Sequence, residues 1–280
     1  MLSPWLQHYW EYMREQPRYA DPLRLLRYGA KAYSQHDEDG LVAEVFRRIG
    51  VGAGTFVELG VGAGLENNTL ALLLGGWRGL WIDANEEDTE KACTRLSRYI
   101  DDGRLRVEHH FVTRDNVDGL LASAAPNKEP DLLSIDIDGN DYWVWQAVSS
   151  IRPRVVIIEY NATWFPPLAM TIAYDESFRW DGTNYFGASL KALEILGRQK
   201  GYHLVGCDFS GTNAFFVRQD LCGERFCAPF DADNHYEPAR YWITHRPSGH
   251  KPGVGVVEPI FDVAPPEERA LAEAVGRGTP

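Results

Sequence analysis

The sequence predicts an α/β protein built on a seven-stranded, mostly parallel β-sheet with helices on both faces. Between residues 55 and 200, short β-branched runs alternate with helical patterns, which is typical of βαβ units in a parallel sheet. A glycine-rich turn follows the first run, and two closely spaced strands end the region. Because a short connection makes two strands antiparallel, we expect a Rossmann-like sheet that ends in a C-terminal antiparallel hairpin.

The individual elements follow from local apolar patterns taken in order. The expected strands occupy residues 55–59, 79–83, 105–112, 131–136, 154–160, 202–207 and 214–218. Segments 86–100 and 142–149 have helical spacing, and leucines on one face indicate a further helix from about residue 190. The expected core is therefore one sheet with helices in most of its crossovers.

The chain divides into three expected parts. Residues 1–50 form an N-terminal helical cap, and residues 51–218 form the cofactor-binding domain that contains the glycine-rich turn. Within that domain, residues 161–188 are an aromatic-rich insertion; loops this long are generally functional or disordered, and the aromatic content argues against disorder. Residues 219–280 form an extension that either wraps the domain or joins a neighbouring subunit, so a homodimer stays open.

The composition excludes several classes of partner. Apolar residues make up 44% of the chain, which suits a packed core, and the net charge is −12. An acidic surface repels phosphate backbones and anionic lipids, so we expect no nucleic-acid partner and no membrane partner. The sequence shows no membrane-spanning stretch, no signal-peptide pattern and no dense cysteine framework. We therefore expect a cytoplasmic protein that acts on a small molecule.

The glycine-rich turn, in the stretch FVELGVGAGLENNT, predicts which cofactor binds. A dinucleotide fingerprint needs a third glycine where this chain has Leu65; here Gly60, Gly62 and Gly64 follow Glu58 at alternate positions. A carboxylate beside the turn would repel a pyrophosphate and suits a positively charged ligand. S-adenosylmethionine (SAM) carries an ammonium group and a sulfonium, so it is favoured over a nicotinamide cofactor and over an unliganded turn.

Asp83, at the end of the second expected strand, is a candidate for the cofactor's ribose. A carboxylate there can accept hydrogen bonds from both ribose hydroxyls. Dinucleotide folds use the same contact, so Asp83 supports adenosine binding without distinguishing between cofactors. The spacing of the acid and the glycines, together with the closing hairpin, makes that distinction.

The chain resembles class I SAM-dependent methyltransferases, and more narrowly the FkbM-like methyltransferases. The resemblance covers about residues 33–218 and is carried by the stretches AYSQHDEDGLVAEVF, FVELGVGAGLENNTLALLLGGWRGLWIDAN, SIDIDGNDYW and GYHLVGCDFSGTNAFFV. It implies that Gln35 lies over the cofactor, that Asp83 contacts the ribose, and that Val112 and Thr113 lie near the adenine. It also implies a pocket for the methionine end, formed by Glu58, Gly60, Gly62, Asn67 and Asn68.

Acids that follow the fourth and fifth strands are the candidate catalytic residues Asp136, Asp138 and Glu159. A hydroxyl acceptor must lose a proton during methyl transfer, which requires a base or a Lewis acid. Asp136, Glu159 and Asn161 could form an oxygen-rich site for Mg²⁺. Alternatively, Asp136 holds the cofactor's amino group, Asp138 caps the next helix, and Glu159 acts as a lone base or binds the substrate. More distant relatives read IDVEG where this chain has IDIDG, so Asp138 is one methylene shorter than its counterpart.

Aromatic residues of the insertion are the candidate substrate wall. The residues concerned are Trp164, Phe165, Tyr174, Phe178, Trp180, Tyr185 and Phe186. We expect a SAM-dependent methyltransferase that acts on a small metabolite at oxygen. The alternatives are N-methylation of an amine or guanidine, another SAM-consuming alkyl transfer, and a non-catalytic SAM-binding protein.

Overall fold

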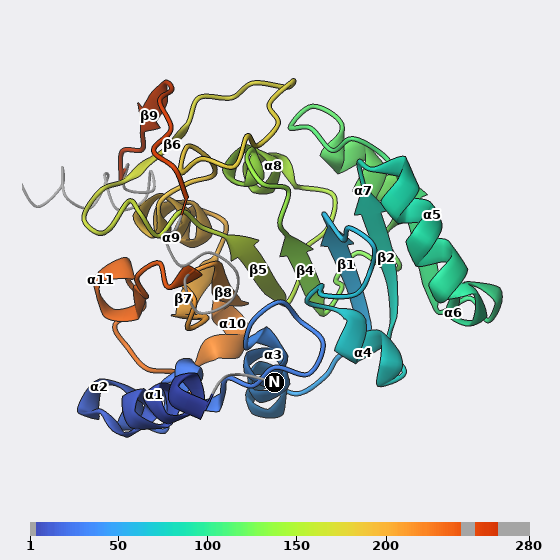
Figure 1. Cartoon of the computed structure of the whole chain (residues 1–280). Helices are drawn as coiled ribbons and strands as arrows, with labels where there is room; N and C mark the ends of the chain where they lie inside the picture. The colour runs from blue at the N-terminus through green and yellow to red at the C-terminus, as the bar shows by residue number, and fades with distance from the viewer. Residues whose placement is uncertain (1–3, 242–249, 263–280) are drawn as a thin grey trace, which may run out of the picture.

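Seven strands form the central sheet in the order β3-β2-β1-β4-β5-β8-β7 (Figure 1). The computed structural model describes residues 4–241 and 250–262. Strands β1 to β5 pair in parallel, whereas β8 runs antiparallel to both β5 and β7. The predicted Rossmann-like sheet with a closing hairpin is therefore confirmed. The strands span Thr55–Leu59 (β1), Arg78–Asp83 (β2), Leu105–His109 (β3), Leu132–Ile135 (β4), Val155–Glu159 (β5), Tyr202–Cys207 (β7) and Asn213–Arg218 (β8).

Helices cover both faces of the sheet, as predicted. One face packs against α3, α4 and α5, and the other packs against α7, α8 and α9. Strands β1, β4 and β5 are buried along their whole length, because a parallel sheet between two helical layers has no solvent-exposed face. The helices span Glu38–Ile49 (α3), Leu70–Leu74 (α4), Glu86–Arg95 (α5), Ser97–Asp101 (α6), Val117–Ala124 (α7), Asp141–Ala147 (α8) and Leu190–Gln199 (α9).

Two predicted elements differ from the structure in their extent. The helix expected over 86–100 is two helices, α5 and α6, because the backbone leaves helical geometry at Leu96. The strand expected over 105–112 ends at His109. No helix in the described part of the chain is both long enough and apolar enough to cross a bilayer.

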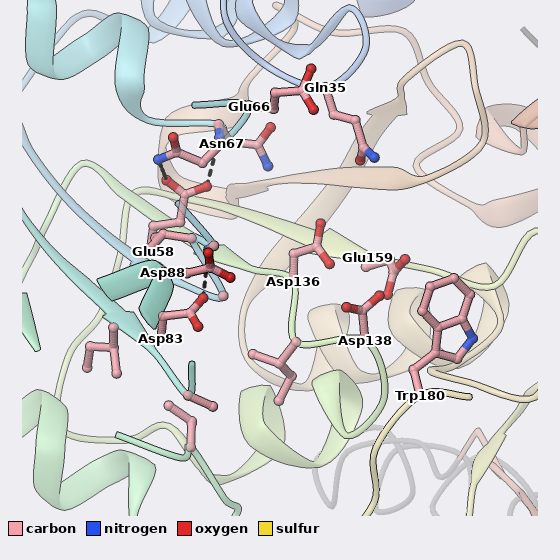
Figure 2. Close-up of a pocket in the computed structure, with 18 of the residues that line it drawn as sticks. Gln35, Glu58, Glu66, Asn67, Asp83, Asp88, Asp136, Asp138, Glu159 and Trp180 are labelled. Atoms are coloured by element: carbon pink, nitrogen blue, oxygen red, sulfur yellow. Dashed lines mark hydrogen bonds between the residues drawn. The ribbon is translucent and has the colours of Figure 1, made fainter. Parts of the chain in front are cut away.

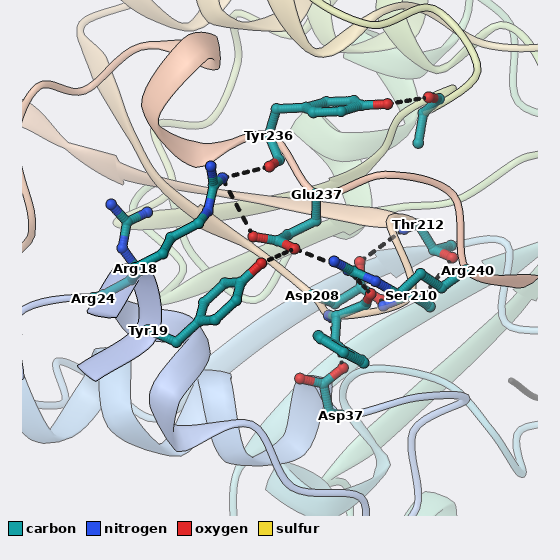
Figure 3. Close-up of polar contacts among 12 residues, drawn as sticks. Arg18, Tyr19, Arg24, Asp37, Asp208, Ser210, Thr212, Tyr236, Glu237 and Arg240 are labelled. Carbon is teal, nitrogen blue, oxygen red and sulfur yellow. Dashed lines mark hydrogen bonds and ion pairs between the residues drawn. The ribbon is translucent and has the colours of Figure 1, made fainter. Parts of the chain in front are cut away.

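The N-terminal segment packs beside the sheet as α1 (Pro4–Glu15), α2 (Pro17–Ala20) and the 3₁₀ helix η1 (Leu25–Tyr28). Figure 3 shows how the C-terminal extension is attached to it. The buried Glu237 carboxylate accepts hydrogen bonds from the Tyr19 hydroxyl and from Arg240, and it forms an ion pair with Arg18 at 3.4 Å. The N-terminal segment and the extension therefore meet through a buried acid with charged partners.

The extension continues from α10 (Gln219–Cys222) and α11 (Ala232–His235) to a segment that we call the C-terminal strap, residues 250–262. The strap lies along the insertion, where β9 (Val257–Pro259) pairs antiparallel with β6 (Met170–Ile172) in a separate two-stranded sheet. The Tyr185 hydroxyl also donates a hydrogen bond to the Val256 carbonyl at 2.7 Å. Within the described residues, the extension thus packs on its own chain.

Candidate active site

A cavity of about 1210 Å³ lies at the carboxyl edge of the parallel strands (Figure 2). Ligands of open α/β sheets bind at this edge. The glycine turn after β1 and Asp83 of β2 line one part of the cavity, and the acids after β4 and β5 line another. The predicted site residues that line it are Gln35, Glu58, Gly60, Gly62, Asn67, Asn68, Asp83, Val112, Asp136, Asp138, Glu159, Phe178 and Trp180.

The glycine turn approaches its neighbours too closely for larger side chains at two positions. Gly60 has φ 81°, and a Cβ there would overlap the Asp136 carbonyl oxygen. Gly64 has φ 70°, and a Cβ there would lie 2.7 Å from a ring carbon of Trp81. Gly64 therefore packs against the core and does not line the cavity. The turn brings the β1 backbone directly against the end of β4, which joins the two parts of the site.

Glu58 organises the loop that follows the turn. Its buried carboxylate accepts hydrogen bonds from the Asn67 side chain, from the backbone N–H groups of Asn68 and Thr69, and from the Thr69 hydroxyl. Trp81 Nε1 donates to the same hydroxyl at 2.7 Å. Burial raises the pKa of the Glu58 carboxyl above its ordinary value. Glu58 therefore holds the loop that carries the asparagine pair, and its side chain also lines the cavity.

Asp83 is tied to the glycine turn. One of its oxygens accepts from the Gly62 N–H at 2.7 Å and the other accepts from the Asn85 N–H at 2.7 Å. Each carboxylate oxygen has two lone-pair sites, so both oxygens can still accept a further hydrogen bond. Val112 lines the cavity, whereas Thr113 does not. The Thr113 N–H and hydroxyl bond to Asn116 at the start of α7, which explains its absence from the lining.

Three carboxyl groups converge after β4 and β5. Asp136, Asp138 and Glu159 each offer an oxygen, and these oxygens all lie within 4.8 Å of one another. We call these residues the acid cluster (Figure 2). Glu159 is 9% exposed, and its Oε2 has no hydrogen-bond partner. Asp138 has φ 55°, a left-handed conformation that is uncommon outside glycine. The chain therefore holds three acids together around an unsatisfied, buried oxygen.

Burial and mutual repulsion raise the pKa values in and beside the acid cluster. The pKa of Asp136 is well above its ordinary value because of burial and then because of Asp138. The pKa of Glu159 is raised in the same way by burial and then by Asp136. Burial also raises the pKa of the neighbouring Asp141 to about 6. These carboxyl groups hold protons unusually tightly unless a cation takes their place.

The alternative in which Asp138 caps the next helix does not match the start of α8. Asn140 is the N-cap residue, and the Asp141 carboxylate accepts hydrogen bonds from the Ile137 and Gly139 N–H groups. Asp138 lies two residues before this N-cap position, so it is not the N-cap residue of the helix. Asp138 instead lies with Asp136 and Glu159.

Asn161 is not brought to the acid cluster. Its side-chain amide donates to the carbonyls of Asn184 and Phe186, and its oxygen accepts from the Thr163 N–H and hydroxyl. The residue is fully buried and does not line the cavity. Because both ends of the amide hold the insertion in place, the expected grouping of Asn161 with Asp136 and Glu159 is wrong for this structure. Asp138 occupies the third place in the cluster.

Among the seven aromatic residues predicted as a substrate wall, Phe178 and Trp180 line the cavity and the other five do not. Tyr174 lies under the Arg114 guanidinium at 4.0 Å from the ring centroid, and Tyr185 binds the strap. Tyr174 and Tyr185 therefore attach the insertion to other parts of the chain.

Several residues that line the cavity are not predicted by the sequence patterns: Asn140, Tyr241, His250, Thr212 and Asn213. Tyr241 and His250 come from the extension, and their rings stack with centroids 4.6 Å apart. His250 also meets Trp180 edge to face at 5.0 Å. Burial and then Glu159 raise the pKa of Tyr241. The aromatic and histidine content of the extension was the available signal, but local patterns do not show where an extension folds back.

Solved methyltransferase structures share parts of this fold. A putative caffeoyl-CoA O-methyltransferase from Staphylococcus aureus is 14% identical, with 75% of this chain and 99% of that chain covered and a TM-score of 0.48. Magnesium protoporphyrin IX methyltransferase from Synechocystis PCC 6803 was solved with bound SAM. It is 12% identical, with 76% of this chain and 96% of that chain covered and a TM-score of 0.40. A SAM-dependent methyltransferase from Clostridium acetobutylicum is 11% identical, with 76% of this chain and 98% of that chain covered and a TM-score of 0.40.

No protein-family model and no curated protein matches the chain. The similarity to solved structures is low in both identity and TM-score, so it carries no argument about activity. The narrower FkbM-like resemblance remains a prediction. The functional assignment therefore depends on the geometry of the cavity.

Proposed function

We propose that this chain is a SAM-dependent methyltransferase that transfers the methyl group to an oxygen of a small molecule. The observation that carries the proposal is one continuous cavity that joins the glycine turn, Asp83 and the acid cluster. Small-molecule sites typically occupy about 300–1,000 Å³. At about 1210 Å³, this cavity has room for a cofactor together with a small acceptor.

The residues around the glycine turn fit SAM. Asn67 Oδ1 is a buried acceptor without a hydrogen-bond partner, and it suits the ammonium group of the methionine end. Asp83 would hold the ribose through its remaining lone pairs, and Gln35 and Val112 lie along the same cavity. When bound, SAM supplies an electrophilic methyl group. The protein's contribution is to position this group beside the acceptor, because methyl transfer depends strongly on alignment.

The acid cluster would handle the acceptor. A carboxyl group with a raised pKa is a better general base near neutral pH than an ordinary carboxyl group. Asp136 and Glu159 both meet that requirement. The spacing of the cluster oxygens also fits a divalent cation, since two oxygens on opposite sides of Ca²⁺ or Mg²⁺ lie roughly 4–5 Å apart. A cation held there would lower the pKa of a coordinated hydroxyl group.

N-methylation of an amine or guanidine is the second candidate, and the charge of the cavity favours it. Among the described lining residues, Arg179 is the one arginine or lysine, and its guanidinium lies 3.5 Å from the Phe111 ring centroid. The charged groups that most affect the pKa values of Asp136 and Glu159 are other carboxylates. A protonated amine could therefore neutralise the acid cluster in place of a metal ion.

A labelling experiment tests the proposal and separates the two candidates. The purified chain is incubated with methyl-labelled SAM and mixtures of hydroxylated and amine metabolites, with Mg²⁺ or with a chelator. We expect a labelled product whose formation falls when the chelator is present. A labelled amine product, formed at the same rate with Mg²⁺ and with the chelator, would favour N-methylation. Tight cofactor binding without any labelled product would instead support a non-catalytic SAM-binding protein.

A further inference from the structure

We propose that Asn213, on β8, supplies the amide oxygen of a divalent-cation site that it forms with the acid cluster. This inference rests on the proposed function, because it completes the cation site described there. The sequence patterns predict an amide after β5, at Asn161. The geometry points to the neighbouring antiparallel strand.

The pairing of the strands places Asn213 beside Glu159. The two residues are Cα partners across the antiparallel β5–β8 pair. Side chains paired in this way project from the same face of the sheet, with Cβ atoms about 4.5–5.5 Å apart. Both residues line the cavity. Asn213 is therefore adjacent to the acid cluster by the register of the sheet, although the two residues are far apart in sequence.

Asn213 and Glu159 each have a buried side-chain oxygen without a hydrogen-bond partner. Asn213 is 2% exposed and its Oδ1 has no hydrogen-bond partner, as is also true of Glu159 Oε2. Buried polar atoms are normally satisfied, so a pair of unsatisfied atoms in one cavity indicates a missing ligand. Both atoms are oxygens that accept hydrogen bonds or bind metal ions. The ligand must therefore be a cation or a hydrogen-bond donor.

A hydrogen bond to Glu38 fixes the orientation of the Asn213 side-chain amide. Its Nδ2 donates to Glu38 Oε1 at 3.0 Å, and Glu38 Oε2 accepts from the His36 N–H at 2.8 Å. A flipped amide would place its oxygen against a carboxylate oxygen and would lose this hydrogen bond. Glu38 is fully buried, so water does not replace the contact. Oδ1 is thus kept available as a ligand atom.

Asn213 has the unpaired amide oxygen that the sequence patterns predict for Asn161. Asn161 uses both ends of its amide within the insertion, whereas Asn213 uses one end and leaves its oxygen unpaired. Carboxylate and amide oxygens together form the ligand set preferred by hard cations such as Mg²⁺, Mn²⁺ and Ca²⁺. The site would then contain the three acids and one amide oxygen.

Mn²⁺ binding by the full chain tests this assignment without any substrate. Mn²⁺ is titrated while free Mn²⁺ is followed by electron paramagnetic resonance, and calorimetry provides a second measurement. We expect Asn213→Ala to weaken Mn²⁺ binding by about tenfold or more. Asn127→Ala is the matched control, because Asn127 also donates to a side chain of a strand, Thr55, but does not line the cavity. It should leave the affinity unchanged.

Two further variants keep the test decisive. Glu38→Gln removes the carboxylate that orients the amide while leaving Asn213 in place, and we expect a severalfold weaker affinity for Mn²⁺. If Asn213→Ala fails to fold, Glu38→Gln tests the same prediction. Asn140→Ala removes another cavity-lining amide oxygen that lacks a partner, at the N-cap of α8. Weaker binding in Asn140→Ala, with unchanged binding in Asn213→Ala and Glu38→Gln, would overturn the proposal.

Failure of this inference can be told apart from failure of the proposed function. Binding of S-adenosylhomocysteine, measured without metal, tests the cofactor site alone. A wild-type chain that binds this compound but not Mn²⁺ would overturn the cation site and leave the methyltransferase proposal standing. A chain that binds Mn²⁺ through Asn213 but ignores the cofactor product would overturn the proposed function and leave the cation site.

Discussion

The two parts of the cavity differ in how far the protein alone satisfies their carboxyl groups. Around the glycine turn, the Glu58 and Asp83 carboxylates accept hydrogen bonds from neighbouring backbone and side-chain groups. In the acid cluster, carboxyl groups face one another and Glu159 Oε2 has no partner. The cofactor part is therefore prearranged, whereas the acceptor part requires a proton or a cation to be stable. Functional sites often carry such strain.

Substitution of Gly60 should break the prearranged part most severely. Gly60→Ala places a Cβ against the Asp136 carbonyl in a backbone conformation with φ 81°. We expect a loss of roughly 2–4 kcal/mol in the free energy of unfolding, together with the loss of cofactor binding. Urea denaturation and calorimetry measure both. Gly62→Ala is the control, because φ is 51° but no atom lies within 4 Å of the added Cβ, so its effect should be clearly smaller.

Glu58→Gln should loosen the cofactor part without adding bulk. The Gln amide would present N–H donors to a site where Asn67, Asn68 and Thr69 already donate. We expect S-adenosylhomocysteine to bind about 30-fold more weakly, equivalent to about 2 kcal/mol. Glu87→Gln, on α5, is the control, because Glu87 forms an exposed ion pair with Lys91 at 2.8 Å and does not line the cavity. Equal losses in the two variants would contradict the role assigned to Glu58.

The pH dependence of stability should expose the acceptor part. Asp136, Asp141 and Glu159 have raised pKa values, so the folded chain binds their protons more tightly than the unfolded chain does. Their contribution to the free energy of unfolding is fully present below about pH 4 and is lost as the pH rises. For Asp141 this loss occurs as the pH passes through about 6. We expect the free energy of unfolding to fall by about 2 kcal/mol between about pH 4 and pH 6 from Asp141 alone, and to fall further because of Asp136 and Glu159.

Added Mg²⁺ sharpens that measurement. Near pH 7, Mg²⁺ should restore stability because it replaces the lost protons in the acid cluster, whereas NaCl at equal ionic strength should restore much less. Unfolding in urea at several pH values, with each salt, measures the difference. Equal effects of the two salts would show that screening alone is responsible.

Tyr185→Phe should have the smallest effect and should act on the acceptor part alone. It removes the hydroxyl that binds the Val256 carbonyl and so loosens the C-terminal strap over the insertion. We expect a loss of about 0.5–1 kcal/mol in stability. The KM for the acceptor should rise severalfold while cofactor affinity stays constant. A matching loss of cofactor affinity would show that the two parts are not separable.

The same contrast explains what could be predicted from the sequence. The strands and the glycine turn are set by local apolar runs and by conformations that glycine adopts, so they are visible in short stretches. Asn161 follows an acid in the expected manner, yet it folds into the insertion, while Asn213 reaches the acids through the register of β8. That register depends on tertiary pairing. Tyr241 lies beside the cavity for the same long-range reason.

The most direct test of the cofactor assignment compares two cofactors on the unmodified chain. Glu58 and the glycine turn should form a seat for the methionine end of SAM and not for a pyrophosphate. Isothermal titration calorimetry with S-adenosylhomocysteine should therefore give saturable binding with a stoichiometry near one, and NAD should give none. Saturable binding of NAD together with no response to S-adenosylhomocysteine would contradict this assignment.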